Sequence, residues 1–443
     1  MKTPIADFLE IYSSSGVSRL HMPGHKGKNR TGVEAYDLTE VRGADVLYSA
    51  DGIIRESEEN ASHLFGAHTF YSAEGSTLAI RAMLKLAADG RKNGERPLIL
   101  AGRNAHKSFI STAALLDLDV EWLLPDGTSH IASCHITKDA VDRAITSSKR
   151  KISAVYITSP DYLGYISDIK AIADACKKHS VPLLVDNAHG AYLAFLEPSL
   201  HPIALGAAMC ADSAHKTLPV LTGGAYLHIS KDFPEYYERA ESALSLFAST
   251  SPSYLILRSL DKCNEYLDGE YPKELSDCIE RVNKLKCKLR GAGISLLETE
   301  PLKITVAASD MGYTGEEISE LLRVCGAECE FADGDYTVLM LSPDNTDEDL
   351  CRVHTALTRI TPRVAEKAQV PPLSREKRVM SIREATFSPA ERVSTASAVG
   401  RICATPTVAC PPAIPIATAG ELITEETVGL LQYYGISAID VVK

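Results

Sequence analysis

The sequence predicts an α/β protein in which a mostly parallel sheet is covered by helices on both faces and is followed by a smaller α+β unit. Between Asp45 and about His228, short apolar runs alternate with helix-like stretches. Alternating β and α units favour a parallel sheet between two helix layers. After about residue 290, strand-like and helix-like segments mix within a shorter span, which is typical of a compact α+β unit.

The first 40 residues are short polar segments around HMPGHKG. Their glycine and proline content predicts no regular structure. We expect residues 1–40 to form an arm that lies on another surface.

Four apolar runs predict buried strands of the sheet, and each ends at polar or small residues. The runs are RPLILAGR, ISAVYITSP, VPLLVDNAHG and GGAYLHIS, with helical patterns such as GSTLAIRAMLKLAADG and DIKAIADACKKH between them. Ligands of such sheets bind beyond the carboxyl ends of the strands. The polar residues that follow these runs are therefore the candidate site.

The second half begins with a helical region that ends at DCIERVNKLKCKLRGAG. The segments KITVAAS, TGEEISELLRVCG, ECEFADGDYTVLML and DEDLCRVHTALTRI then predict the small α+β unit, and a linker rich in proline and charge follows. We expect an arm at 1–40, a large domain with trailing helices at 41–290, a small domain at 291–362, and a linker with a C-terminal extension at 363–443.

Composition excludes several classes of protein. The 443 residues include 58 acidic and 46 basic side chains, for a formal net charge of −12, which argues against nucleic-acid binding and favours small, even cationic, substrates. No apolar run approaches the roughly 20 residues of a membrane span, and the start lacks the plan of a signal peptide. Eleven cysteines without a CxxC pair predict a reduced, cytoplasmic protein without structural zinc.

Four clusters at predicted strand ends carry the chemistry: AEGST (73–77), RNAHKS (103–108), VDNAHG (185–190) and SAHKT (213–217). Together they fit one cofactor better than four functions. Lys216 follows an apolar stretch and has Ser213 and His215 beside it. A lysine whose pKa is lowered by burial is a Schiff-base nucleophile, although a lysine taken alone is usually a surface residue.

The other three clusters suit the remaining parts of the same cofactor, pyridoxal phosphate. Asp186 could hold the ring nitrogen protonated, and Gly75, Ser76 and Thr77 stand before a helix whose N-terminus would attract a phosphate. His106 offers a flat ring for stacking. Taken singly, Asp186 is better explained as a turn or capping aspartate and Ser76 and Thr77 as a plain helix cap, whereas His106 is equally well explained as a strand-end histidine.

Two other patterns carry less weight. Lys107-Ser108 resembles the end of a Walker A motif, but His106 replaces the required glycine. His21 and His25 are four residues apart, yet Pro23 and Gly24 break any helix between them. We therefore expect neither a nucleotide site nor a metal site.

The motif set resembles the Orn/Lys/Arg decarboxylase family across essentially the whole chain. The matching segments are HMPGHKG, DGIIRESEENASHLFGA, GST, NAHKS, TSPDYLGYISDI, VDNAHGAY, SAHKTLPVLTGGA and the C-terminal CPPAIPIATAGELIT. The resemblance implies a fold type I, aspartate aminotransferase-like enzyme with a seven-stranded sheet in a large domain that binds pyridoxal phosphate. It also implies the shorter form, without a receiver-like N-terminal domain, and a homodimer with shared active sites.

The resemblance also implies roles for individual residues. Lys216 would attach the cofactor, Asp186 would pair with its ring nitrogen, and His106 would stack on the ring. The remaining expected contacts are the phosphate ligands Gly75, Ser76, Thr77, Ser213 and His215, with Thr222 reaching the phosphate of a partner subunit, and His189 near the reacting groups.

Two positions depart from the family pattern. Glu74 stands where an asparagine commonly precedes GST, which places an acid near the expected phosphate cradle. In the C-terminal signature, Cys410 and Ala413 replace an aromatic residue and a glycine.

The implied reaction is decarboxylation of lysine, ornithine or arginine to a polyamine-type amine, with Lys216 or His189 as the proton donor. Glu421 is the candidate anchor for the cationic side chain, and the sequence does not choose among the three substrates. The first alternative is another fold type I enzyme, an aminotransferase or a different lyase; in an aminotransferase, Arg352, Arg359 or Arg363 would be the carboxylate clamp. A catalytically silent regulatory homologue is the second.

Overall fold

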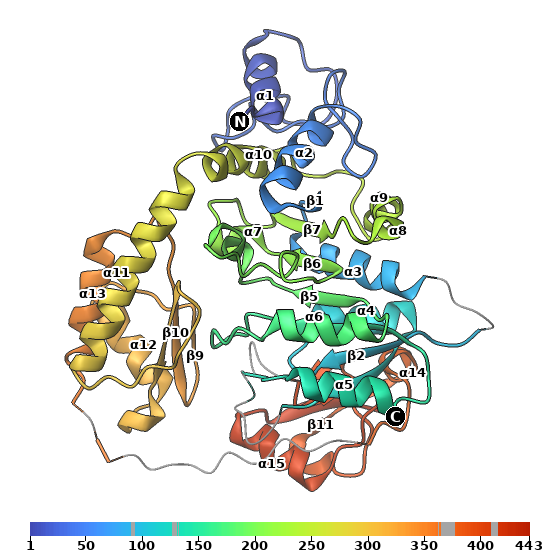
Figure 1. The fold of residues 1–443 in the computed structure, drawn as a ribbon, viewed down its shortest axis with the longest axis vertical. Helices are drawn as coiled ribbons and strands as arrows, with labels where there is room; N and C mark the ends of the chain where they lie inside the picture. The colour runs from blue at the N-terminus through green and yellow to red at the C-terminus, as the bar shows by residue number, and fades with distance from the viewer. Residues whose placement is uncertain (90–93, 126–130, 132, 362, 365–376, 409–414) are drawn as a thin grey trace. The chain divides into compact units, whose positions relative to one another are not determined.

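The computed structural model describes residues 1–89, 94–125, 131, 133–361, 363–364, 377–408 and 415–443. These residues fall into two compact units. The first unit comprises residues 1–123, 137–159 and 168–271, and the second comprises 124–136, 160–167 and 272–443. Figure 1 shows the elements of both.

A mostly parallel sheet of seven strands forms the centre of the first unit, as far as the described residues show, in the order β1-β7-β6-β5-β4-β2-β3. Its strands are β1 (His68–Ser72), β2 (Leu98–Gly102), β3 (Asp119–Leu123), β4 (Ile152–Thr158), β5 (Leu183–Asp186), β6 (Met209–Asp212) and β7 (Ala225–Ile229). Strand β7 runs antiparallel to both β1 and β6, and the remaining pairs are parallel. The α/β class with a mostly parallel sheet is therefore confirmed.

All four predicted strands are present, as β2, β4, β5 and β7. The apolar pattern did not predict β1, β3 and β6. The first two contain polar residues (HTFYS and DVEWL), and β6 (MCAD) is only four residues long.

Helices cover both faces of the sheet (Figure 1). Helices α3 (Gly75–Ala88) and α4 (Lys107–Leu116) contact each other, as do α5 (Lys138–Ser147) and α6 (Ile169–Lys178) on the opposite face. The other helical elements of this unit are the 3-10 turn η1 (Ala191–Phe195), α7 (Ala214–Thr217), α8 (Pro234–Tyr237), α9 (Ala240–Ser245) and α10 (Tyr254–Asp268).

The N-terminal segment contains regular structure, contrary to the expectation. Helix α1 (Pro4–Ser14) buries Ile5 and Leu9 and contacts α2 (Ile53–Phe65) and α10. The backbone N–H groups of Ile5 and Ala6 donate to the buried Asp261 carboxylate, at 3.0 and 2.9 Å. Pro4 is the first residue of α1, where proline is tolerated, and the other glycines and prolines of the segment lie after Ser14, so they do not disturb the helix.

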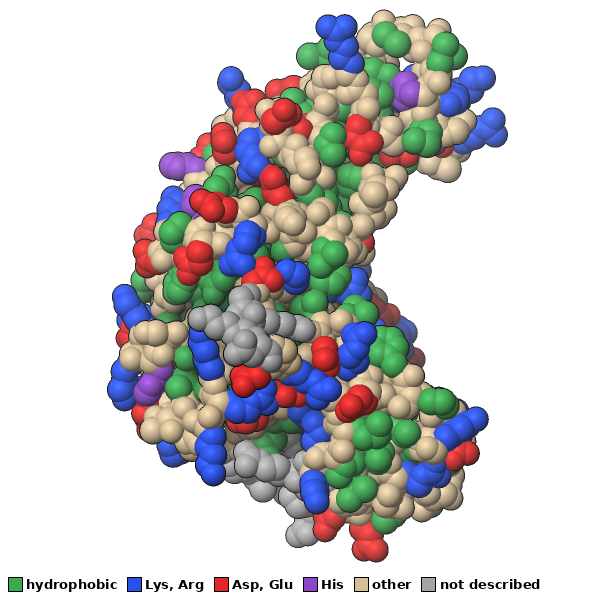
Figure 2. Space-filling view, turned by 90° about the vertical axis from the view of Figure 1, so that its right-hand side faces the viewer, with side chains coloured by type: hydrophobic (Ala, Val, Ile, Leu, Met, Phe, Trp, Pro, Cys, Tyr) green, Lys and Arg blue, Asp and Glu red, His purple; other side chains and the backbone are tan. Residues whose placement is uncertain are grey.

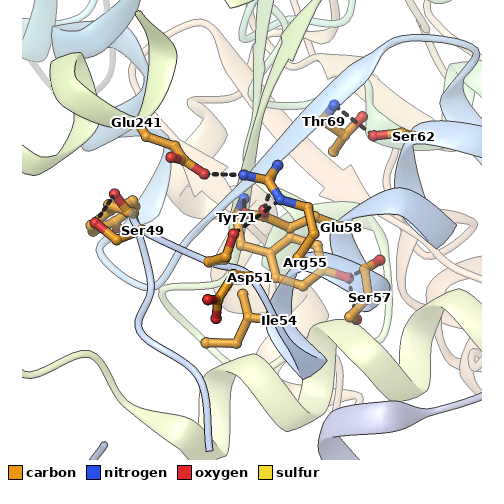
Figure 3. Close-up of polar contacts among 12 residues, drawn as sticks. Ser49, Asp51, Ile54, Arg55, Ser57, Glu58, Ser62, Thr69, Tyr71 and Glu241 are labelled. Atoms are coloured by element: carbon orange, nitrogen blue, oxygen red, sulfur yellow. Dashed lines mark hydrogen bonds and ion pairs between the residues drawn. The ribbon is translucent and has the colours of Figure 1, made fainter. Parts of the chain in front are cut away.

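Polar contacts join α2 to the edge strand β1 (Figure 3). The cluster AEGST follows β1 directly in the chain. Glu58 accepts a hydrogen bond from the backbone N–H of Tyr71 at 2.8 Å, and the hydroxyls of Ser57 and Tyr71 are 2.7 Å apart. Arg55 forms ion pairs with Glu58 and with Glu241. Burial raises the pKa of Glu58 to about 8.

Most of the long helix α11 (Tyr271–Gly291) belongs to the second unit. Its antiparallel sheet has the order β8-β10-β9, with β8 (Lys303–Ala307), β9 (Phe331–Ala332) and β10 (Tyr336–Met340). Helices α12 (Gly315–Val324) and α13 (Asp347–Leu357) begin at capping boxes of Thr314 with Glu317 and Thr346 with Asp349. Such reciprocal hydrogen bonds satisfy backbone N–H groups that have no partner within the helix.

The C-terminal part of this unit holds short elements. They are α14 (Ile382–Phe387), β11 (Ala390–Ser394), β12 (Thr407–Val408), β13 (Ala417–Thr418), α15 (Glu425–Tyr433) and β14 (Ala438–Val442). Strand β11 pairs with β14, and β12 with β13. Helix α15 follows the stretch GELIT, with Thr424 as its N-cap.

Charges of both signs are mixed on the face shown in Figure 2, where Lys and Arg lie between Asp and Glu. No helix within the described ranges is long and apolar enough to cross a membrane.

Candidate active site

The carboxyl ends of the neighbouring strands β5 and β6 bring the predicted lysine and histidine together. Strand β5 ends at Asp186, and His189 lies in the turn that follows. Strand β6 leads through Ser213 into the short helix α7, which carries Lys216. Lys216 Nζ lies 3.0 Å from His189 Nε2. The side chain of Lys216 is exposed in this single chain, not buried as the nucleophile argument assumed.

Asp186 is a buried carboxylate, only 2% exposed. It accepts hydrogen bonds from the hydroxyl of Tyr156 at 3.0 Å and from the backbone N–H of Ala188 at 3.3 Å. Burial raises its pKa, against the opposing effects of His106, the Tyr156 hydrogen bond and Lys216. The surrounding residues therefore offset only part of the free-energy cost of burying the Asp186 charge, so a cation of a ligand could pair with this carboxylate.

His106 caps the N-terminus of α4, where its Nδ1 lies 2.8 Å from Ser108 Oγ. His106 is exposed, but desolvation by the surrounding protein lowers its pKa. The negative charge of Asp186 opposes this effect, and Lys216 and Lys107 add to it. These charge interactions place His106, Asp186 and Lys216 in one electrostatic environment.

The N-terminus of α3 holds the residues that were expected to bind a phosphate. Gly75 has φ +72°, a conformation that a side chain disfavours, and its N–H donates to Gly223 O at 2.7 Å. Ser213 Oγ donates to Ser76 Oγ at 2.7 Å, so hydroxyls from two separate elements meet at this helix end. Thr77 lies in the same first turn and is partly exposed. Free backbone N–H groups and the helix dipole attract anions to such a position.

Glu74 precedes the cradle, but its carboxylate has a partner elsewhere. Glu74 Oε1 accepts a hydrogen bond from the backbone N–H of Ser249 at 2.6 Å. The acid that replaces the usual asparagine is thus engaged by the loop that contains Ser249.

Thr222 lies in the turn before β7, and His215 of α7 contacts the end of that turn. His215 Nδ1 lies 2.9 Å from Gly224 O, which fixes its ring against the turn. Thr222 is exposed and lies next to Gly223, whose carbonyl accepts from Gly75. Both residues therefore border the loop that receives the N-terminus of α3.

Several predicted residues belong to the second unit. Glu421 is 2% exposed, and its Oε2 accepts from Thr418 N at 2.8 Å. The arginines of the aminotransferase alternative are exposed, with Arg352 on Glu348 at 2.6 Å, Arg363 on Glu317 at 3.0 Å and Arg359 on Cys325 Sγ at 3.5 Å. Local partners thus hold all three. Cys410 and Ala413 lie outside the described residues.

His21 and His25 of the N-terminal segment have separate hydrogen-bond partners. His21 Nε2 lies 2.6 Å from the Tyr12 hydroxyl, whereas His25 Nε2 lies 3.0 Å from Asp37.

Sequence reasoning missed three residues that support the site. Tyr156 binds Asp186 from inside β4, and Thr158 pairs with Asp186 in the strand register. Thr158 Oγ1 is buried and has no hydrogen-bond partner among the described residues. Asn187 donates to the buried Asp212 at 2.8 Å. The polar end of ISAVYITSP signalled Thr158, but no pattern identified which buried tyrosine would contact Asp186.

The arrangement fits pyridoxal phosphate in three respects. The α3 N-terminus with Ser76 and Ser213 suits the phosphate, and the buried Asp186 suits a protonated ring nitrogen. Lys216 with His189 at 3.0 Å suits an aldehyde carbon and the proton transfers around it.

Comparison with known proteins gives the same picture. The family model "Orn/Lys/Arg decarboxylase, major domain" matches residues 3–309. An arginine decarboxylase of Bacillus subtilis is 28% identical over 97% of this chain and 93% of its own length. An arginine decarboxylase of Halalkalibacterium halodurans is also 28% identical, again over 97% and 93%.

Among solved structures, the constitutive lysine decarboxylase of E. coli matches 100% of this chain and 82% of its own, with a TM-score of 0.82 at 17% identity. This similarity establishes a shared fold, of the type I class expected from the sequence.

Proposed function

Because this chain belongs to the Orn/Lys/Arg decarboxylase family and is a pyridoxal-phosphate-dependent amino-acid decarboxylase, we propose that its substrate is a basic L-amino acid, with arginine the first candidate. Two relatives that cover 97% of the chain are named arginine decarboxylases. The net charge of −12 favours a cationic substrate over an anionic one. The product would be the corresponding amine, a polyamine precursor, and CO2.

The contact between Lys216 Nζ and His189 Nε2, beside the buried Asp186, carries this proposal. It combines a nucleophile, a second base and a carboxylate suited to a ring nitrogen at two adjacent strand ends. Bound pyridoxal phosphate supplies the electron sink for the electron pair that remains when CO2 departs.

The residues of the chain would act around that cofactor. Asp186 would hold a proton on the ring nitrogen, because burial disfavours an isolated carboxylate and favours one paired with a cation. Ser76 and Ser213 would donate hydrogen bonds to the phosphate. His106 would bind the ring face. Lys216 or His189 would deliver a proton to Cα, and their 3.0 Å separation allows a proton to pass between them.

Further parts of the proposal concern the assembly. A cytoplasmic homodimer with shared active sites would place Thr222 and HMPGHKG near the site of a neighbouring subunit. The exposure of Thr222 supports this assignment.

Gly75, Thr77 and His215 would complete the phosphate environment. Glu421 would be the acidic anchor for the substrate side chain, and its buried carboxylate suits a cationic group.

The test is CO2 release by the protein loaded with pyridoxal phosphate, with arginine, lysine, ornithine and leucine as separate substrates. We expect release from one basic amino acid and none from leucine. Lys216→Ala should abolish release, whereas Lys170→Ala, which removes an exposed lysine paired with Asp174, should leave it unchanged. Cofactor attachment at Lys216 without release from any basic amino acid would contradict the substrate assignment and favour a silent homologue.

A further inference from the structure

A hydrogen bond between two buried side chains joins the turns that carry the proposed active-site residues. Asn187 follows Asp186 at the end of β5, and Asp212 ends β6 immediately before Ser213. Asn187 Nδ2 donates to Asp212 Oδ1 at 2.8 Å, and both residues are 0% exposed. This contact joins the turn of His189 to the turn of Lys216, because Asn187 and Asp212 stand at the starts of those turns, where a backbone hydrogen bond from Asn187 N to Ala211 O at 2.9 Å also joins the strands.

Other buried groups hold Asp212 in place. Its Oδ2 lies 3.0 Å from His201 Nε2 and 3.3 Å from His228 Nε2, and Cys210 Sγ donates to its Oδ1 at 3.2 Å. His228 comes from β7, and its Nδ1 lies 2.9 Å from Thr69 Oγ1 of β1. Strands β1, β5, β6 and β7 are thus linked through one carboxylate.

The packing around Asn187 leaves its side chain little freedom. A Cβ atom at Gly190 would lie 2.0 Å from Asn187 Oδ1 and 2.8 Å from Leu193 Cδ1. Gly190 has φ −120°, which any residue adopts, so space and not backbone conformation requires glycine there. The amide of Asn187 is therefore held from one side by Asp212 and from the other by the turn that contains His189.

His201, Cys210 and Asp212 also have the residue types of a metal site, with donor atoms within 4.8 Å of one another. Their distances are those of hydrogen bonds to a carboxylate. A histidine that binds a metal through Nε2 needs an acceptor for its Nδ1–H, and His201 Nδ1 is buried without a hydrogen-bond partner among the described residues. The geometry therefore favours a hydrogen-bond network.

We propose that Asn187 and Asp212 are positioning residues that hold the β5 and β6 turns together, so that Asp186 and His189 face Lys216. The inference rests on the proposed roles of those three residues. Neither Asn187 nor Asp212 would touch the cofactor or the substrate. Their effect would pass through the distance between Lys216 and His189, and a displacement of about 1 Å costs on the order of 100-fold in rate.

The test is a double-mutant cycle of Asn187→Ala and Asp212→Ala. If Asp212→Ala does not fold, Asp212→Asn takes its place in the cycle. The readouts are kcat and KM with the loaded enzyme, and the pH dependence of acetylation of Lys216 in the cofactor-free protein, measured by mass spectrometry. We expect each single variant to lower kcat about 10- to 100-fold with KM within about 3-fold. The midpoint of Lys216 acetylation should move, because the distance between the Lys216 amine and the His189 ring changes. The double variant should match the worse single variant, because one interaction is lost in each case.

Two further variants separate positioning from general destabilisation. Gly190→Ala should reproduce the effects of Asn187→Ala, because its Cβ displaces the Asn187 amide. Asn264→Ala is the matched control. Asn264 is also 0% exposed and donates to Ser57 O and to the Tyr71 hydroxyl in the same unit. It should lower thermal stability but leave kcat and Lys216 acetylation unchanged.

Three outcomes would overturn the proposal: additive effects in the cycle, an unchanged acetylation midpoint in both single variants, or a stoichiometric metal ion in the purified protein. Failure of the wild type to attach pyridoxal phosphate at Lys216 would instead contradict the proposed function. The two failures are therefore distinguishable.

Discussion

Asp186 and Asp212 end two neighbouring parallel strands, and both are buried, yet the protein treats them in opposite ways. Burial raises the pKa of Asp186, and the opposing effects of His106, Tyr156 and Lys216 do not overcome it. Burial acts on Asp212 in the same direction, but His201 and His228 overcome it and hold the pKa of Asp212 well below its usual range.

The two aspartates differ in how many hydrogen-bond and charge partners the chain itself supplies to each carboxylate. Asn187 and Cys210 donate hydrogen bonds to Asp212 Oδ1, His201 Nε2 lies at hydrogen-bond distance from Oδ2, and the His228 ring lies beside the same oxygen at 3.3 Å. Asp186 has one hydroxyl and one backbone N–H, and no cation of the described residues pairs with it directly. A buried acid whose partners are complete stabilises the fold, whereas one with an incomplete set is suited to a ligand that brings the missing charge. Four acids test this interpretation.

The largest effect is expected at Asp186. Asp186→Ala should lower kcat about 100- to 1,000-fold, because the ring nitrogen of the cofactor loses the carboxylate that keeps it protonated. Steady-state decarboxylation assays measure this loss. Folding should change little, since the folded protein gains no stability from an acid whose pKa it raises. A variant with normal kcat would break the contrast with Asp212.

At Asp212 the expected effect is on stability. Asp212→Asn should lower the free energy of unfolding at pH 7 by about 2–3 kcal/mol, because a charge-assisted network is lost. The folded protein depresses the pKa of Asp212, so its stabilisation is present above the unfolded value of 3.8 and declines as the pH falls below it. Urea unfolding of wild type and variant at pH 7 and at pH 3.5 should show the difference shrinking at the lower pH.

Glu58 is a third buried acid, with Tyr71 N as a hydrogen-bond donor and an Arg55 ion pair at 3.7 Å. Its folded pKa is about 8, raised by burial from 4.5. Folding therefore favours the protonated form, and wild-type stability should decline as the pH rises from about 5 to 8. Glu58→Gln should flatten that decline and add on the order of 1 kcal/mol at pH 8, as thermal melts across this pH range would show. A steeper decline in the variant would contradict the assignment.

The smallest effect is expected at Glu74, an exposed acid beside the phosphate cradle. Its carboxylate binds Ser249 N, so Glu74→Gln should change the Kd for pyridoxal phosphate less than about 3-fold. Ser76→Ala removes a predicted phosphate ligand and should weaken binding about 10-fold or more. Equilibrium titration of the cofactor-free variants measures both. A gain of 10-fold or more in Glu74→Gln would show that the acid acts on the cradle.

Sequence patterns predicted much of the fold because its strands are apolar runs with polar ends. RPLILAGR, ISAVYITSP and VPLLVDNAHG are buried on both faces of the sheet, and such strands need no alternation of polar and apolar residues. Edge strand β3 was not predicted, because its exposed positions carry polar residues. Helix α1 was not predicted, because the glycines and prolines that follow it dominated the composition of the first 40 residues.

By itself, the sequence determined which residues stand at strand ends and which chemical groups they carry. The clusters AEGST, RNAHKS, VDNAHG and SAHKT were sufficient to predict Lys216, Asp186, His106 and Ser76 as one site, since parallel strands bring their ends to one edge. Only the tertiary structure decided which of two adjacent aspartates is fully paired. That outcome depends on His201 and His228, which come from separate segments and converge on Asp212 when β6 and β7 pair and the loop after η1 packs against them. Electrostatic energy depends on distances between atoms, and distances between remote segments are set by packing and not by local sequence patterns.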